Sequence, residues 1–119
     1  MKNAKVKIGN TEIDAEVAGS FFSKARGLMF RRLLPEKNGM LFVFSREAYH
    51  AIWMFGMRFP IDIIWIDAKK HIVDLVQNAR PCLLLCKVYL PKKKAKYVLE
   101  VNAGFVEKNR IKLGHKASF

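Results

Sequence analysis

Apolar and polar residues alternate over residues 4–18, and this alternation predicts a β-hairpin. The apolar residues at 6 and 8 alternate with lysines, and those at 13, 15 and 17 alternate with acidic residues. A period of two is the pattern of a strand that is buried on one face. Gly9-Asn10 lies between the two halves, and Asn and Gly are typical of tight hairpin turns. We therefore expect an apolar inner face and an outer face on which Lys lies opposite Glu or Asp.

Further segments also have the pattern of strands. Ile61–Ile66 follows Pro60 and is almost entirely apolar, which favours a central strand buried on both faces. Residues 111–115 predict a turn into a short terminal strand. The remaining expected strands are Met40–Phe44, His50–Met54, His71–Val76 and Tyr97–Val101.

Two short helices are expected between these strands. Ser20 is a good N-cap residue for a helix over about residues 21–29, and residues 103–109 predict one or two helical turns. Residues 78–96 contain two prolines and both cysteines, and we interpret them as a long ordered loop. The fold class expected is mainly β, with α+β as the alternative: a compact, mostly antiparallel small barrel or curled sheet.

Length and composition predict one globular domain over residues 1–119. The chain is 51% hydrophobic, as is usual for globular proteins. No apolar run reaches the roughly 18 residues that a membrane span requires, and the first residues lack the apolar region of a signal peptide. We therefore expect a cytoplasmic protein with no membrane partner.

The formal net charge of +12 restricts the partners more than the fold. Lysines at 87, 92, 93, 94 and 96 lie in a stretch without acidic residues. One interpretation is a polyanion-binding patch of Lys92, Lys93, Lys94 and Lys96. The other is a solvated loop that keeps the protein soluble. Nucleic-acid binders usually combine such lysines with arginines and aromatic residues, and this run contains no arginine.

Several common sites have no counterpart in the sequence. There is no glycine pattern of a phosphate loop and no Gly-x-Ser-x-Gly frame around a serine. The three histidines, His50, His71 and His115, fall in three separate elements, whereas zinc sites usually pair their ligands locally. We therefore expect no metal and no cofactor, and no catalytic constellation is recognisable.

Cys82 and Cys86 are the two cysteines of the chain. A separation of four residues allows a disulfide if the loop turns, because bridged Cα atoms lie roughly 4.4–6.8 Å apart. Two reduced thiols beneath neighbouring leucines are the alternative, and both interpretations remain open on these residues alone.

Three charged residues and two apolar ones within the stretch 26–67 form the candidate ligand-binding set: Arg26, Trp53, Met54, Arg58 and Asp62. Asp62 lies between two isoleucines, and a carboxylate in apolar surroundings is costly unless it is paired or used. It could form a structural ion pair with Arg26 or Arg58. Alternatively, Arg26 and Asp62 could be the polar base of a pocket walled by Trp53.

Three sequence motifs resemble the DUF192 (UPF0127) family. They are Arg26-Gly27-Leu28-Met29, Gly39-Met40-Leu41-Phe42, and Trp53-Met54 followed by Phe59-Pro60-Ile61-Asp62-Ile63. Phe55-Gly56 replaces the Lys-Asn that is common in the family at this point. The resemblance implies a compact, mostly β domain with no established reaction, and it favours a local bridge between Cys82 and Cys86.

These observations leave three classes of function. We expect a module that binds a small ligand or a protein partner through the aromatic, Arg and Asp cluster. The alternative is a basic protein associated with nucleic acid. An enzyme that uses Asp62 as acid or base, with Arg26 stabilising charge, has the least support because no second catalytic group is evident.

Overall fold

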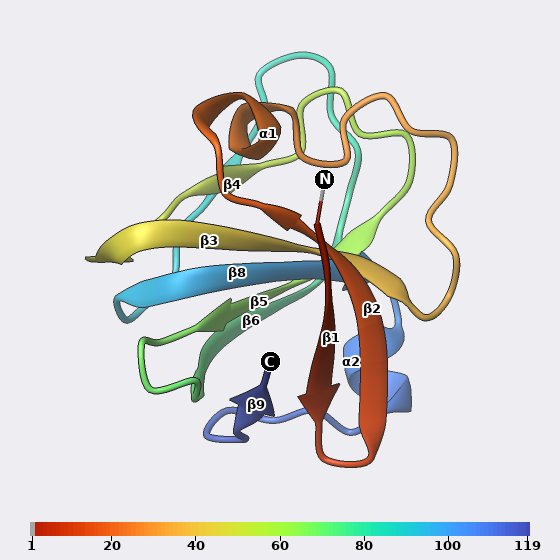
Figure 1. Ribbon diagram of the computed structural model, residues 1–119. Helices are drawn as coiled ribbons and strands as arrows, with labels where there is room; N and C mark the ends of the chain where they lie inside the picture. The colour runs from red at the N-terminus through yellow and green to blue at the C-terminus, as the bar shows by residue number, and fades with distance from the viewer. Residues whose placement is uncertain (1) are drawn as a thin grey trace.

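A curled sheet of seven strands forms the body of the protein (Figure 1). The computed structural model describes residues 2–119, apart from the side chains of Phe21, Phe22 and Ala25. The strand order is β6-β5-β8-β3-β2-β1-β9, and a separate two-stranded sheet pairs β4 with β7. The elements are β1 Asn3–Ile8, β2 Thr11–Ala18, α1 Phe21–Arg26, β3 Asn38–Ala48, β4 Ile52–Trp53, β5 Ile61–Ile66, β6 Ile72–Ala79, β7 Val88–Tyr89, β8 Ala95–Asn102, α2 Phe105–Lys108 and β9 Ala117–Ser118.

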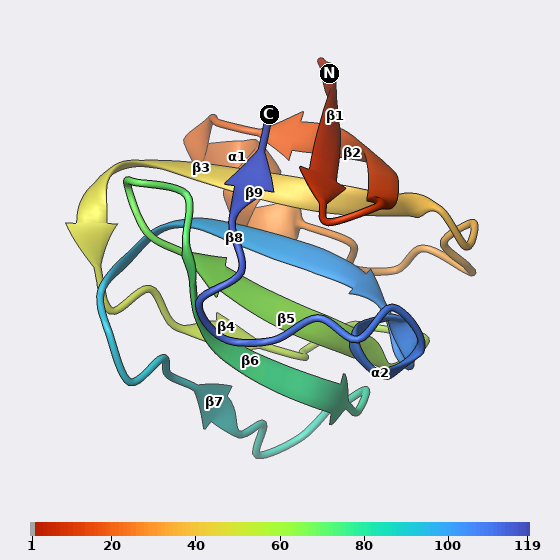
Figure 2. The same cartoon turned by 90° about the horizontal axis from the view of Figure 1, so that it is seen from below.

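The mainly β fold class is confirmed, and neighbouring strands in the large sheet are antiparallel except for β2 and β3. This parallel pair arises because α1 and the segment after it return the chain to the same end of the sheet before β3 begins. Seen from below, the C-terminal segment crosses the open side of the sheet from α2 to β9, which lies beside β1 (Figure 2). A bridge between His71 and Lys116, with backbone hydrogen bonds from Ile72 to His115 and from Ala117 to Lys70, links the two ends of the curl.

Both faces of the central strands are buried, so the protein has two apolar cores. One core, enclosed by the curl, contains Ile64, Leu99 and Val101 together with Phe105 of α2. The other contains Ile63, Trp65 and Val98 and is covered by Leu28 and Met54 from the segments around α1 and β4. All six residues of β5 are buried. Successive residues of one strand therefore face different cores.

Several expected elements have different bounds in the structure. The hairpin over residues 4–18 and the strand Ile61–Ile66 form as expected, and α1 ends three residues earlier than expected. β3 runs to Ala48 because its exposed end pairs with the start of β8. The expected loop 78–96 contains β7, whose two residues pair with β4. The expected apolar positions Phe21 and Ala25 fall among the side chains outside the described part of α1. Among the described residues, no helix is long and apolar enough to cross a membrane.

Candidate functional site

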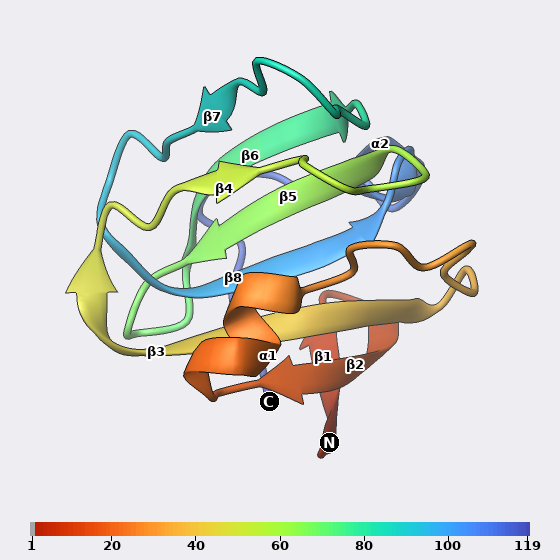
Figure 3. The ribbon, with the colours of Figure 1, turned by 90° about the horizontal axis from the view of Figure 1, so that it is seen from above.

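A small hollow lies over β8, between α1 on one side and β4 on the other. Figure 3 shows these two elements covering the same face of the sheet. The hollow has a volume of about 210 Å³. Its lining is mostly apolar and contains three charged residues; it consists of Lys24, Arg26, Gly27, Leu28, Met29, Phe42, Ala51, Ile52, Trp53, Met57 and Glu100.

Glu100 supplies the buried carboxyl of this hollow. It lies on β8 between Met40 of β3 and Ile63 of β5, and only 5% of the residue is exposed. No hydrogen bond to its carboxyl group is found among the described residues. Burial raises the pKa of Glu100 to about 8, because an ionised carboxylate loses hydration in this position. At neutral pH the carboxyl is therefore mostly protonated and can donate a hydrogen bond.

Arg26 lies at the rim of the same hollow. It is the last residue of α1, and Gly27 ends the helix with a φ of 51°. A Cβ atom on Gly27 would lie 3.1 Å from the ring of Phe42, so glycine allows the end of the helix to approach β3 closely. Arg26 is exposed, and none of the ion pairs of the described residues includes it. Lys24, by contrast, donates to the carbonyl oxygen of Val43 at 3.2 Å.

Trp53 forms the aromatic wall of the hollow. It is 54% exposed, and its ring centroid lies 5.3 Å from that of Phe55. Pairing of Trp53 with Val88 in the two-stranded sheet fixes its backbone. The neighbouring Met54 points the other way and is 1% exposed, within the core beneath. The structure thus brings Arg26 and Trp53 together at one cavity, with Met54 packed in the core.

Asp62 lies on the opposite face of the sheet, and the expected ion pair with Arg26 is wrong. On β5, Asp62 alternates with Ile61 and Ile63, which belong to the core beneath the hollow. Its two carboxylate oxygens accept the backbone N–H groups of Asn78, at 2.8 Å, and Val106, at 2.9 Å. Asp62 is fully buried and fixes the end of β6 and the start of α2.

Arg58 is separate from both carboxyl groups. It is exposed and lines a second hollow of about 670 Å³, beside Phe30, Met57 and Cys82. Its expected ion pair with Asp62 is also not formed. The five residues predicted as one ligand-binding set are therefore distributed over the small hollow, the core, the second hollow and the far face of the sheet.

Cys82 and Cys86 form a disulfide, with Cα atoms 5.6 Å apart. The backbone of Cys82 is held by two hydrogen bonds, from its N–H to Met54 at 3.2 Å and from Gly56 N–H to its carbonyl oxygen at 3.1 Å. Among the described residues, no group of three or more His, Cys, Asp or Glu side chains is arranged to hold a metal ion.

The lysines of the predicted polyanion patch lie at the start of β8 and in the turn before it. Lys92, Lys93 and Lys94 are exposed, and Lys96 is half-buried. The backbone N–H of Lys92 donates to the carboxylate of Asp74 at 2.8 Å, which ties this turn to β6. Lys96 lies near the ring of Tyr97, with its Nζ 5.8 Å from the ring centroid.

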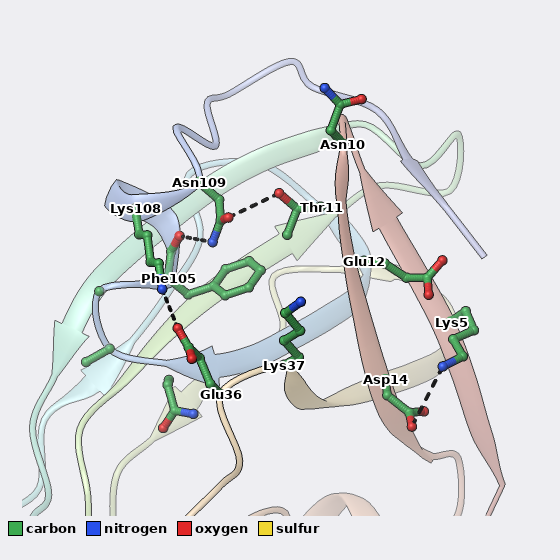
Figure 4. Close-up of a pocket in the computed structure, with 13 residues that line it drawn as sticks. Lys5, Asn10, Thr11, Glu12, Asp14, Glu36, Lys37, Phe105, Lys108 and Asn109 are labelled. Carbon is green, nitrogen blue, oxygen red and sulfur yellow. Dashed lines mark hydrogen bonds and ion pairs between the residues drawn. The ribbon is translucent and has the colours of Figure 1, made fainter.

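A larger polar cleft of about 560 Å³ lies between the β1–β2 hairpin and α2 (Figure 4). Its side chains mainly bind one another: Lys108 pairs with Glu36, Lys5 approaches Asp14 at 4.0 Å, and Thr11 donates to Asn109 at 3.2 Å. The hydrogen bond from Lys108 lowers the pKa of the exposed Glu36. Charges that are exposed and already paired provide little binding energy, so the smaller hollow is the stronger candidate site.

Sequence reasoning missed Glu100, although the pattern that drew attention to Asp62 is present there too. Glu100 stands between Leu99 and Val101 in the expected strand Tyr97–Val101. Only the pairing of β8 with β3 and β5 reveals that its side chain lies under α1 and β4.

The fold places the protein in a structural class, the curled β half-barrels. One face of its sheet is covered by a short helix and a two-stranded sheet. The chain belongs to the DUF192 family, described as an uncharacterized ACR, whose model matches residues 4–119. A UPF0127 protein of Thermococcus sibiricus is 34% identical over 102 residues, which are 83% of this chain and 61% of that protein. A UPF0127 protein of Pyrococcus abyssi is 32% identical over 106 residues, 87% of this chain and 84% of that protein.

Two solved structures have the same fold. A protein of unknown function from Novosphingobium aromaticivorans is 26% identical with a TM-score of 0.89, over 98% of this chain and 85% of that chain. A protein from Sinorhizobium meliloti, called a "putative transcription regulator", is also 26% identical with a TM-score of 0.85, over 96% of this chain and 89% of that chain.

Replacing Asp62 by Asn should destabilise the protein. An amide offers one acceptor oxygen, so one of the two N–H groups, of Asn78 or Val106, would face an NH₂ group. We expect a loss of roughly 1.5–3 kcal/mol in the free energy of unfolding, measured by urea titration. Hydrogen exchange of the Val106 amide should also accelerate. Asp14→Asn, at an exposed ion pair, should cost less than about 1 kcal/mol; equal losses in the two variants would contradict this role.

The stability of the protein should fall as pH rises from about 5 to about 8. The folded-state pKa of Glu100 is raised to about 8, so over this range the folded chain retains a proton that the unfolded chain releases. This one group would lower the free energy of unfolding by roughly 1 kcal/mol per pH unit.

Glu100→Gln should remove this slope and be the more stable protein at pH 9. Glu12→Gln, at an exposed position on β2, is the matched control and should keep the slope of the unmodified chain. Urea unfolding at a series of pH values measures both effects. A slope that persists in Glu100→Gln would assign the pH dependence to other groups.

Proposed function

We propose that this protein is a single-domain binding module for a small ligand, which enters the hollow between α1 and β4. The observation that carries the proposal is the nearly buried carboxyl of Glu100 at a cavity, with no hydrogen-bond partner among the described residues. The carboxyl group reaches solvent only through the hollow, so it is poorly hydrated there and gains little from water. A ligand that hydrogen-bonds to this carboxyl would therefore gain more than it would from a fully hydrated group.

The lining favours a ligand with an acidic group on a small apolar body. The Glu100 carboxyl is a hydrogen-bond donor near neutral pH, and Arg26 is a cation at the rim. Both suit a carboxylate. The apolar lining and Trp53 suit a ring or a branched chain. An empty cavity of roughly 150 Å³ can bind benzene, so about 210 Å³ is enough for a single-ring acid.

The charge of the chain supports the same choice. A net charge of +12 attracts anions and repels amines at long range. A cationic ligand would gain from an ionised Glu100 but would have to pass Lys24 and Arg26. An enzyme remains the weakest class, because the second titratable group of the hollow, Lys24, already donates to the carbonyl oxygen of Val43, and the described lining contains no hydroxyl or thiol nucleophile.

Benzoate and benzylamine form a matched pair of probes, since they have the same ring and opposite charge. We expect benzoate to raise the melting temperature and benzylamine to leave it unchanged. A ligand at 100 times its Kd adds about 2.7 kcal/mol of stability. Benzoate affinity should fall about tenfold per pH unit above pH 8, as Glu100 ionises beside the ligand carboxylate.

Variants of the lining separate the proposed site from other positions. Arg26→Gln should weaken benzoate binding at least about tenfold, because it removes a charged hydrogen-bond donor. Arg32→Gln, at another exposed arginine, should not. Glu100→Gln keeps a donor and should bind benzoate without the loss above pH 8. Binding of benzylamine that strengthens up to pH 8 would instead indicate a cationic ligand.

Polyanion binding is the second candidate function. It is supported by the exposed Lys92, Lys93 and Lys94 and by the name of the Sinorhizobium meliloti protein, a "putative transcription regulator". We expect weak binding to duplex DNA that disappears as salt increases. Each phosphate contact contributes about 0.9 to the slope of log K against log salt. Neutralising Lys92, Lys93, Lys94 and Lys96 should flatten that slope, and an unchanged slope would contradict this location.

A further inference from the structure

Three consecutive leucines in the connection between β6 and β7 extend into solvent. Leu83 is 75% exposed, Leu84 81% and Leu85 94%. We call Leu83, Leu84 and Leu85 the leucine tip; the connection that carries it is the uppermost loop in Figure 1. Single exposed leucines are ordinary. Three in a row are unfavourable in water unless something covers them.

The backbone holds the leucine tip away from the body of the protein. The Cys82–Cys86 disulfide closes the loop at its base, and hydrogen bonds with Met54 and Gly56 attach Cys82 to the segment after β4. Leu85 has a φ of 55°, a left-handed conformation that residues other than glycine rarely adopt. Such a conformation persists where the surrounding structure imposes it. The exposed leucines are therefore a constrained feature of the fold.

Cationic residues lie beside the leucine tip. Arg80 precedes Leu83 by three residues and Lys87 follows Leu85 by two, and both are exposed. Lys92 lies farther away, because its backbone is held against Asp74 near the start of β6. Beside Leu83, the hollow of about 670 Å³ is lined by Phe30, Met57 and Pro81, and its charged residue is Arg58.

We propose that the leucine tip and the basic residues around it dock the protein on the surface of an anionic lipid bilayer. The leucines would enter the boundary between headgroups and acyl chains, and the lysines and arginines would contact lipid phosphates. The expected absence of a membrane partner rested on the lack of a spanning segment. Docking on a surface requires no such segment.

Other occupants fit these observations less well. A second copy of the chain would bring two sets of like charges together around the leucines, which opposes association. Nucleic acid would satisfy the lysines but would leave the leucines in water, since bases stack on aromatic or arginine side chains. An anionic bilayer satisfies both the apolar and the charged groups.

Vesicle binding tests the proposal with the whole chain. We expect cosedimentation with phosphatidylcholine vesicles that contain phosphatidylglycerol and little with phosphatidylcholine alone. The combined variant Leu83→Ser, Leu84→Ser, Leu85→Asn should lower the partition coefficient at least about tenfold. Asn is chosen at position 85 because it tolerates a positive φ. The control variant Leu33→Ser, Leu113→Ser changes leucines that are 67% and 60% exposed elsewhere and should bind as the unmodified chain does.

Charge variants test the contribution of the basic residues beside the leucine tip. Each of Arg58→Gln, Arg80→Gln and Lys87→Gln should weaken binding to the anionic vesicles roughly fivefold. Lys112→Gln and Lys116→Gln, in the segment before β9, are the matched controls. In Leu84→Trp, the new tryptophan should shift its emission to the blue and be quenched by brominated lipid on vesicle binding, which reports depth directly.

Three results would overturn the proposal. Vesicle binding that the leucine variant leaves unchanged would indicate a purely electrostatic contact. No binding to anionic vesicles, together with concentration-dependent dimerisation that the leucine variant abolishes, would identify a second copy as the occupant. Equal loss of duplex DNA binding and vesicle binding in the leucine variant would indicate a general polyanion surface. Because none of these measurements involves the hollow at Glu100, they are independent of the proposed ligand.

Discussion

The burial of both faces of β5 and β8 is the constraint on which the rest of this structure depends. A strand with water on one face can direct its polar residues outward, but β5 and β8 have no such face over most of their length. Each acidic residue on them must therefore be paired, hydrogen-bonded or protonated. Asp62 accepts two backbone N–H groups, whereas Glu100 has only a cavity beside it and a raised pKa. The two carboxyl groups, in neighbouring strands, thus have different consequences: Asp62 stabilises the fold, and Glu100 is the basis of the proposed ligand site.

Local patterns in the sequence were sufficient to predict the elements that depend on local rules. The hairpin of β1 and β2 follows from alternation and a Gly-Asn turn, and the bounds of β5 follow from Pro60 and the apolar run after it. The pairing of β4 with β7 could not be predicted in this way, because two-residue strands have no periodicity of their own. The same limit explains the error at Asp62. Which face a buried residue takes depends on the neighbouring strands, and a strand buried on both faces has no polar alternation to indicate it.

The disulfide illustrates a different relation between sequence and structure. The separation of Cys82 and Cys86 permitted a bridge without requiring one, and resemblance to the family favoured it. The structure adds that the three leucines inside the disulfide ring are exposed to solvent. The sequence alone was equally compatible with leucines that cover two buried, reduced thiols. A short apolar run has no periodicity that would distinguish a buried segment from an exposed one. The exposure of each leucine could be determined only from the path of the backbone in the structure.

The hollow and the leucine tip are connected through the two-stranded sheet. Trp53, the wall of the hollow, pairs with Val88, which follows the disulfide ring by two residues, and Cys82 is hydrogen-bonded to Met54 and Gly56. A contact that moves the ring therefore acts on the strand that carries Trp53. Thermodynamic linkage sets the condition for communication between the two proposed sites. If a ligand in the hollow favours one position of β4, it changes the affinity of the leucine tip for a lipid surface, and binding to that surface changes the affinity for the ligand by the same factor. If β4 keeps one position in both states, the two sites are independent despite their proximity.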